Sequence, residues 1–182
     1  MKKHKTKNKK YPLNIKLANG MSAYVPLQKK FSNSFLRKHG CSIMAEYVAL
    51  QLFGVKKIWR KTLYPIYIYE WHRKHTPKAV KKKVTLKGVA IGINKIGKGR
   101  CKAKYYTMPN SEIMKKSMKA GAVVIMELGK PIHSITLIYD SGIYWRIDYG
   151  KCRKVNVDRM AKKATKNGTY CGMIIVTKKG DR

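Results

Sequence analysis

Short apolar runs of strand length fill the C-terminal third of the chain, and they restrict the fold more than any other feature. Several of them alternate apolar and polar residues with a period of two, and turn residues separate them. The expected strands cover residues 122–128, 132–140, 143–149, 153–157 and 170–177, with a short helix at residues 158–164. Because such runs with short connections favour hairpins, they predict an antiparallel sheet.

Helical patterns dominate the part of the chain that precedes these strands. Residues 42–53 are apolar around most of the helix circumference, and Gly54 follows as a natural C-terminal stop. Further helices are expected at residues 64–73, 85–96 and 111–120, the last with Ser111 as its N-cap. Helices followed by an antiparallel sheet place the chain in the α+β class.

The first twenty residues differ from the rest in composition. They are rich in lysine and asparagine, and Pro12 and Gly20 discourage regular structure. We therefore expect a flexible basic tail at residues 1–20 and one domain at residues 21–182.

The chain is strongly basic, with 42 Lys and Arg against 8 Asp and Glu and a net charge of +34. Its 44% of hydrophobic residues nevertheless predicts a folded core, because disordered basic segments are poor in apolar residues. No apolar run approaches the ~20 residues that span a bilayer, so no membrane span is expected. No apolar segment follows the basic N-terminus as in a signal peptide, which predicts a cytoplasmic protein.

Scarce acids and scattered cysteines exclude several chemistries. Mechanisms that need clustered carboxylates have few to use, and helix faces, helix starts or the terminus account for Glu46, Glu112 and Asp181. The four cysteines form no C-x-x-C pair, so no metal site is expected. Without a signal peptide they are read as thiols in a reducing compartment. They are Cys41, Cys101, Cys152 and Cys171.

Cys41 occupies the position of a nucleophile. Residues 39–42 read His-Gly-Cys-Ser and stand directly before the expected apolar helix. At a helix N-terminus, unpaired backbone N–H groups and the helix dipole favour the thiolate. The alternative is that Cys41 is a small buried side chain at a helix start.

A nucleophilic cysteine needs a base, and the base needs an orienting group. His4 lies in the tail, and His72 and His75 are expected on an exposed helix. His133 is different because it opens an apolar strand, and the next strand contains the acid Asp148. The alternatives are a satisfied histidine at a strand end and an acid that forms a turn.

The expected hairpin brings these two residues together. With a two-residue loop at residues 141–142, the register places Asp148 opposite Ile135, which shares a face with His133. The two residues are then diagonal neighbours at ~7 Å between backbones, within reach of their side chains. In this hypothesis Cys41 attacks a carbonyl carbon, His133 moves the proton and Asp148 fixes the imidazole. The reaction is hydrolysis of a peptide or amide bond in a peptide or protein substrate, and it needs no metal or organic cofactor.

This order of residues resembles a known family. Two segments carry the resemblance. The first is the helix start Gly40-Cys41-Ser42, and the second is the hairpin of residues 131–148, which reads Pro-Ile-His-Ser-Ile-Thr-Leu-Ile-Tyr-Asp-Ser-Gly-Ile-Tyr-Trp-Arg-Ile-Asp. Together they resemble the papain-like cysteine peptidases of the bacteriocin-processing, double-glycine-leader type. The resemblance covers residues 25 to about 176 and suggests a stand-alone, divergent member. It implies a papain-like fold, with the Cys helix packed on a C-terminal antiparallel sheet, and a catalytic Cys, His and Asp in that order.

The resemblance also implies a Gln upstream of the Cys as an oxyanion-hole donor. Gln28 is the upstream Gln, and Asn33 is a nearer residue that can donate a similar hydrogen bond. The sequence departs from the family at Ser42, where Gly is common, and at Tyr149, where Pro is common.

Two other features compete with this interpretation. Residues 92–99 nearly match a phosphate-binding loop, but Gly99 replaces the required hydroxyl residue, and a helix end with a glycine turn explains the segment better. The dispersed lysines predict weak contact with nucleic acid or another polyanion, although no nucleic-acid motif accompanies them. A third hypothesis is a papain-like fold that binds peptides without catalysis.

Overall fold

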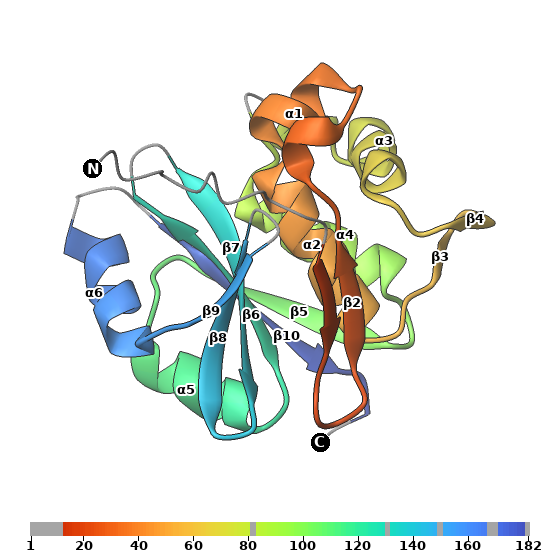
Figure 1. The fold of residues 1–182 in the computed structure, drawn as a ribbon. Coiled ribbons are helices and arrows are strands. Elements are labelled where there is room, and N and C mark those ends of the chain that lie inside the picture. The colour runs from red at the N-terminus through yellow and green to blue at the C-terminus, as the bar shows by residue number, and fades with distance from the viewer. Residues whose placement is uncertain (1–12, 81–82, 130–131, 149–150, 167–170, 181–182) are drawn as a thin grey trace, which may run out of the picture.

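The computed structural model describes residues 13–80, 83–129, 132–148, 151–166 and 171–180, and its centre is a six-stranded antiparallel sheet (Figure 1). The strand order is β5-β10-β6-β7-β8-β9. In this order the strands are β5 (Cys101–Tyr106), β10 (Met173–Lys178), β6 (Val123–Leu128), β7 (His133–Asp140), β8 (Ile143–Asp148) and β9 (Lys151–Lys154). The predicted α+β class is confirmed.

Helices cover both faces of this sheet (Figure 1). On one face, α5 (Ser111–Lys119) and α6 (Val157–Lys166) bury methionine and alanine side chains against β6, β7 and β10. On the other face lie α2 (Cys41–Leu52) and α4 (Leu86–Ile96). Several smaller elements surround α2 and α4. They are α1 (Ser34–His39), α3 (Pro65–His75), the 3-10 turns η1 (Gln28–Lys30) and η2 (Pro77–Ala79), and a small hairpin of β3 (Lys57–Ile58) and β4 (Lys61–Thr62).

The predicted register of the β7–β8 hairpin is confirmed. Asp140 pairs with Ile143 and Thr136 with Ile147, across a two-residue turn. Both turn residues, Ser141 and Gly142, have positive φ angles, as the tightest hairpin turns require. The register therefore brings the start of β7 and the end of β8 to the same end of the hairpin.

The expected boundary of the basic tail at residue 20 is wrong. Leu13–Lys16 forms strand β1, which pairs with β2 (Ser22–Val25), and Ile15 and Ala23 are buried as a cross-strand pair. The backbone N–H of Ala18 also donates to Asp140 Oδ1 at 2.9 Å, which ties this hairpin to the central sheet. A short apolar alternation among lysines is therefore enough to form a strand once it pairs with β2, which packs on α2. Residues 1–12 of the expected tail lie outside the described residues.

Several expected boundaries also shift. The sheet has a strand that the sequence analysis omitted, β5, and β9 begins before the expected residue 153. Helix α1 was not expected. The N-cap of α5 is Asn110 and not the expected Ser111, because the Asn110 side chain accepts a hydrogen bond from the N–H of Ile113. Tyr149 and Tyr170, at the ends of two expected strands, lie outside the described residues.

The core between α2, α3 and α4 contains a buried Glu–His pair. His72 Nε2 lies 2.7 Å from Glu46 Oε2, and both side chains are fully buried. The expectation that His72 is exposed is therefore wrong, and Glu46, which was assigned to a helix face, is its buried partner. His72 Nδ1 lies 2.7 Å from Thr76 Oγ1, so both ring nitrogens have partners. Burial raises the pKa of Glu46, an effect that the nearby His72 opposes.

Gly92 allows α4 to pack closely against this pair. A Cβ atom at this position would collide with Glu46 Oε1 and would lie 2.8 Å from His72 Nε2. We predict that Gly92→Ala destabilises the protein by about 1–3 kcal/mol through overpacking, although Gly to Ala in a helix interior normally stabilises by up to ~1 kcal/mol. Urea denaturation measures the change. The exposed Lys95→Ala in the same helix is the control, and equal stability of the two variants would contradict the prediction.

Candidate active site

Cys41 is the first residue of α2, and the chain reaches it through a sharp junction with α1. Gly40 ends α1 with its N–H on the Leu36 carbonyl and accepts from Met44 with its own carbonyl. A Cβ at Gly40 would collide with the Leu36 carbonyl oxygen, so only glycine fits between the two helices. The junction holds the Cys41 thiol at the positive end of α2, where backbone N–H groups have no partner within the helix.

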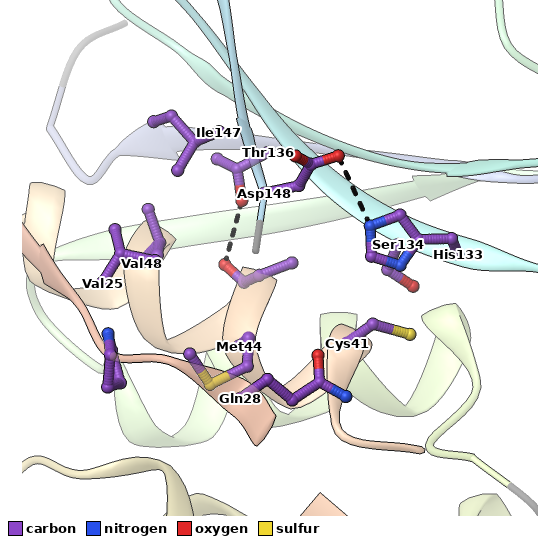
Figure 2. Close-up of a pocket in the computed structure, with 12 residues that line it drawn as sticks. Val25, Gln28, Cys41, Met44, Val48, His133, Ser134, Thr136, Ile147 and Asp148 are labelled. Atoms are coloured by element: carbon purple, nitrogen blue, oxygen red, sulfur yellow. Dashed lines mark hydrogen bonds and ion pairs between the residues drawn. The ribbon is translucent and has the colours of Figure 1, made fainter. Parts of the chain in front are cut away.

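His133 and Asp148 meet at the end of the β7–β8 hairpin. His133 is the first residue of β7 and Asp148 the last residue of β8, and His133 Nε2 lies 3.5 Å from Asp148 Oδ2. In Figure 2 the His133 ring lies between the Asp148 carboxylate and Cys41. Their positions at strand ends let the His133 side chain reach Cys41 at the N-terminus of α2 while Asp148 contacts His133. The structure therefore brings together the three predicted site residues.

Two arginines that the sequence analysis did not consider contact the Asp148 carboxylate. Arg146 Nε donates to Asp148 Oδ2 at 2.8 Å, and Arg146 Nη2 contacts the same oxygen. Arg153 Nη2 lies 3.8 Å from that oxygen. Arg146 stands two residues before Asp148 on the same strand face and pairs with Arg153 on β9, so this spacing was a signal in the sequence. The carboxylate that faces His133 is thus also held by cations.

The electrostatics of the three groups favour the charged forms of Cys41 and His133. Burial raises the pKa of Cys41, but hydrogen bonds with His133 and Ser134 and the charge of His133 bring it below its ordinary value. Burial lowers the pKa of His133, but hydrogen bonds with Asp148 and Cys41 outweigh burial and raise it. The pKa of Asp148 is lowered against the effect of burial by His133 and Arg146. A thiolate beside an imidazolium is the arrangement that these shifts favour.

The other three cysteines differ from Cys41 in this respect. Burial, with a contribution from Glu46, raises the pKa of Cys101 to about 11. Burial also raises the pKa values of Cys152 and Cys171. All four thiols are free of disulfides, so Cys41 is the one cysteine in the chain whose pKa is lowered.

Gln28 and Asn33, the two alternatives for an oxyanion donor, have different surroundings. Gln28 is buried in η1 and lines the same cavity as Cys41, with its amide near the Cys41 side chain in Figure 2. Asn33 Oδ1 instead accepts the N–H of Leu36 at 3.0 Å as the N-cap of α1, and it does not line the cavity.

The cavity at Cys41 has a volume of about 20 Å³, room for about one water molecule. It lies where α2, the segment before η1 and the β7–β8 hairpin meet. Its polar lining comes from the site residues together with Ser134 and Thr136. The Thr136 hydroxyl donates to the Ala45 carbonyl at 3.5 Å (Figure 2). Ser134, which contacts the thiol, was not identified from the sequence, where it is one small polar residue in an apolar strand.

The remaining features of the sequence have structural explanations. Residues 92–99 cover the end of α4 and a glycine turn, since Gly97 is the C-cap and Gly99 has a positive φ angle. Within the described residues, no group of three or more His, Cys, Asp or Glu has a metal-binding arrangement. In the same part of the chain, no helix combines the length and apolar character needed to cross a bilayer.

No protein-family model matches the sequence, and a search of curated proteins finds no match.

The proximity of the three site residues predicts coupled titration. We expect Cys41→Ala to lower the pKa of His133, because it removes a hydrogen bond and a negative charge from the imidazolium, and Asp148→Asn to lower it further. NMR titration of the histidine ring protons measures both changes, with the exposed His75 as the internal reference. A His133 titration that neither substitution changes would contradict the geometry described above.

Proposed function

We propose that the protein is a cysteine hydrolase that cleaves a peptide or amide bond, with Cys41 as nucleophile, His133 as general base and acid, and Asp148 as the orienting group. One observation carries the proposal. The chain's one thiol with a lowered pKa starts a buried helix and lies beside a histidine that a carboxylate contacts on its other side. A perturbed nucleophile, base and orienting acid around one cavity are the elements of covalent acyl transfer.

The acylation step follows from the orientation of the imidazole. Since Nε2 faces Asp148, Nδ1 is the nitrogen that takes the Cys41 proton. The thiolate sulfur attacks the carbonyl carbon, and the carbonyl electron pair moves onto oxygen. The side-chain amide of Gln28 and the backbone N–H of Cys41 are the proposed donors to that oxyanion. When the intermediate collapses, the C–N bond breaks, the imidazolium gives its proton to the leaving amine, and a thioester remains on Cys41.

Deacylation uses the same groups with water. His133 takes a proton from a water molecule, and the resulting hydroxyl attacks the thioester carbon. The C–S bond breaks, the carboxylic acid leaves, and the proton stays on His133 beside the released Cys41 thiolate, which restores the thiolate–imidazolium pair. Asp148 keeps the imidazole oriented through both steps, and Arg146 in turn restrains the Asp148 carboxylate.

We propose further that the α+β architecture is of the papain-like kind. A Cys-bearing helix packed against an antiparallel sheet, with the His and Asp on successive strands, supports this assignment. The resemblance to bacteriocin-processing peptidases rests on the same residues.

The proposed role of Gln28 has a matched control in Asn33. We predict that Gln28→Ala lowers kcat by about 10²–10³-fold with folding intact, because it removes an oxyanion donor. Asn33→Ala should instead cost about 1 kcal/mol of stability, because it removes a helix cap, and should leave kcat unchanged. Hydrolysis of a synthetic peptide library, read by mass spectrometry, measures activity, and Cys41→Ala must abolish it. Equal kcat values for wild type and Gln28→Ala would contradict the role of Gln28.

The net charge of +34 favours a second candidate function, the binding of a polyanion through the basic surface. In that case Cys41→Ala leaves binding unchanged, and the logarithm of the affinity falls linearly with the logarithm of the salt concentration. A papain-like fold that binds peptides without catalysis would show neither hydrolysis nor this steep salt dependence.

A further inference from the structure

A second cavity, of about 470 Å³, lies at the end of α2 opposite Cys41. The β1–β2 turn, the ends of α2 and α5, the turn after α4 and the end of β10 meet there, toward the bottom of Figure 1. The lining of this cavity, called the basic cavity below, includes Met21, Phe53, Gly99, Arg100, Lys178 and Lys179.

The basic cavity is separate from the site proposed for hydrolysis. It shares no lining residue with the cavity at Cys41. Leu52, in its wall, is the last residue of α2 and lies roughly 16 Å along the helix axis from Cys41, the first. A ligand in this cavity therefore does not contact the proposed catalytic groups.

The positive charge of the basic cavity exceeds what the neighbouring helix ends offset. Arg100, Lys178 and Lys179 contribute three cations, and no carboxylate is among the described residues of the lining. A helix C-terminus carries about half a negative charge, so the ends of α2, α4 and α5 together offset about 1.5 charges. The surplus favours an anion with more than one negative charge.

The side chains that carry this charge have no acceptor within the protein. In the described part of the chain, neither a hydrogen bond nor an ion pair engages the side chain of Arg100, Lys178 or Lys179. Arg100 Nη1 would lie 3.1 Å from a Cβ at Gly54, which places the guanidinium at the end of α2. The Gln51 carbonyl there already accepts the N–H of Gly54 at 2.8 Å. The planar guanidinium is thus available to bind a phosphate through two N–H groups.

The backbone brings two of the cations together beside an open glycine. The N–H of Lys179 donates to the Arg100 carbonyl at 2.9 Å. Gly99, next to Arg100, has a φ angle of +87° and open space where a Cβ would lie, so a phosphate can approach the backbone closely. This glycine turn ends the segment at residues 92–99 that nearly matches a phosphate-binding loop. Here it contributes an open backbone and a neighbouring cation, without the helix N-terminus of such a loop.

Part of the wall of the basic cavity is apolar. Met21 and Phe53 line it and are only partly buried against the core, so their apolar surface is available for contact. A free phosphate gains nothing from such a wall, whereas an aromatic base can pack on it. The cavity volume lies within the ~300–1,000 Å³ usual for small-molecule sites.

We propose that the basic cavity binds a small organic phosphate of the nucleotide class. Its phosphate groups contact Arg100, Lys178 and Lys179, and its base packs against Phe53 and Met21. This inference does not rest on the hydrolase function, because the two sites share no residue. It also differs from polyanion binding over a dispersed surface, because it assigns one recess and a ligand small enough to enter it.

Fluorescence anisotropy with an ATP analogue labelled on its ribose, at physiological salt, tests this assignment. We expect unlabelled ATP to compete about tenfold better than tripolyphosphate, because the base contributes by packing. Arg100→Ala should weaken binding about tenfold or more, because it removes charged hydrogen bonds to phosphate. Lys178→Ala combined with Lys179→Ala is a second, independent variant with the same expected result. All three positions are exposed, and urea denaturation verifies folding.

A matched control separates the cavity from the overall charge. The combined cavity variant, with alanine at all three cationic positions, is compared with Arg159→Ala, Lys162→Ala and Lys163→Ala combined. The control removes the same one Arg and two Lys from exposed positions of α6, which does not line the basic cavity. It should change the affinity by less than about twofold. Cys41→Ala should bind like wild type, so failure of the hydrolase function leaves this test unaffected.

Three results would overturn the nucleotide site. They are equal weakening by the two combined variants, competition by tripolyphosphate as strong as that by ATP, and absence of saturable binding of the analogue. Tighter binding of a single-stranded oligonucleotide that the combined cavity variant does not weaken would also overturn it, because anions would then bind the dispersed basic surface instead.

Discussion

The packing of α2 against the central sheet determines the geometry of the site. This helix is buried over nearly its whole length, and Ile43, Ala49 and Leu50 are fully buried. The Thr136 hydroxyl of β7 donates to the Ala45 carbonyl of α2, which joins the two elements that carry Cys41 and His133. A nucleophile at the start of such a helix is positioned by the core instead of by a mobile loop, as precise covalent chemistry requires. The close approach at Gly40 and the buried Glu46–His72 pair restrain the same helix from two further sides.

The scarcity of acids gives most carboxylates a defined partner. Asp148 is held by Arg146, Glu127 by Lys83, and Asp158 by Lys115. Some of the excess cations also have structural roles. The basic cavity at the C-terminal ends of α2 and α5 is lined by Arg100, Lys178 and Lys179. Their positive charges offset the negative ends of the two helix dipoles.

The sequence predicted the elements whose signals are local. The long apolar pattern of α2, the hairpin register and the positions of Cys41, His133 and Asp148 follow from periodicity and turn geometry, which need no knowledge of the rest of the fold. The pairing of His133 with Asp148 was predictable because a two-residue turn fixes every later pair.

The elements that the sequence analysis missed depend on contacts between distant segments. Strand β1 is stabilised by β2 and by Asp140, and the burial of His72 depends on Glu46 in another helix and on the small size of Gly92. The contact of Cys41 with His133 likewise required the packing of α2 on the sheet. Strand β5 alternates apolar residues with Lys102 and Lys104, which is a strand signal that was overlooked, and its place at the edge of the sheet depends on pairing with β10.

The rate of alkylation of the four cysteines as a function of pH tests the central claim most directly. Iodoacetamide labelling, with each cysteine quantified by peptide mass spectrometry, separates Cys41 from Cys101, Cys152 and Cys171. The account predicts that Cys41 alone reacts rapidly below neutral pH, because its thiolate is stabilised by the His133 imidazolium, and that His133→Ala removes this reactivity. If Cys41 reacts no faster than the other three cysteines, or if His133→Ala has no effect, the thiolate–imidazolium pair does not exist and the account is contradicted.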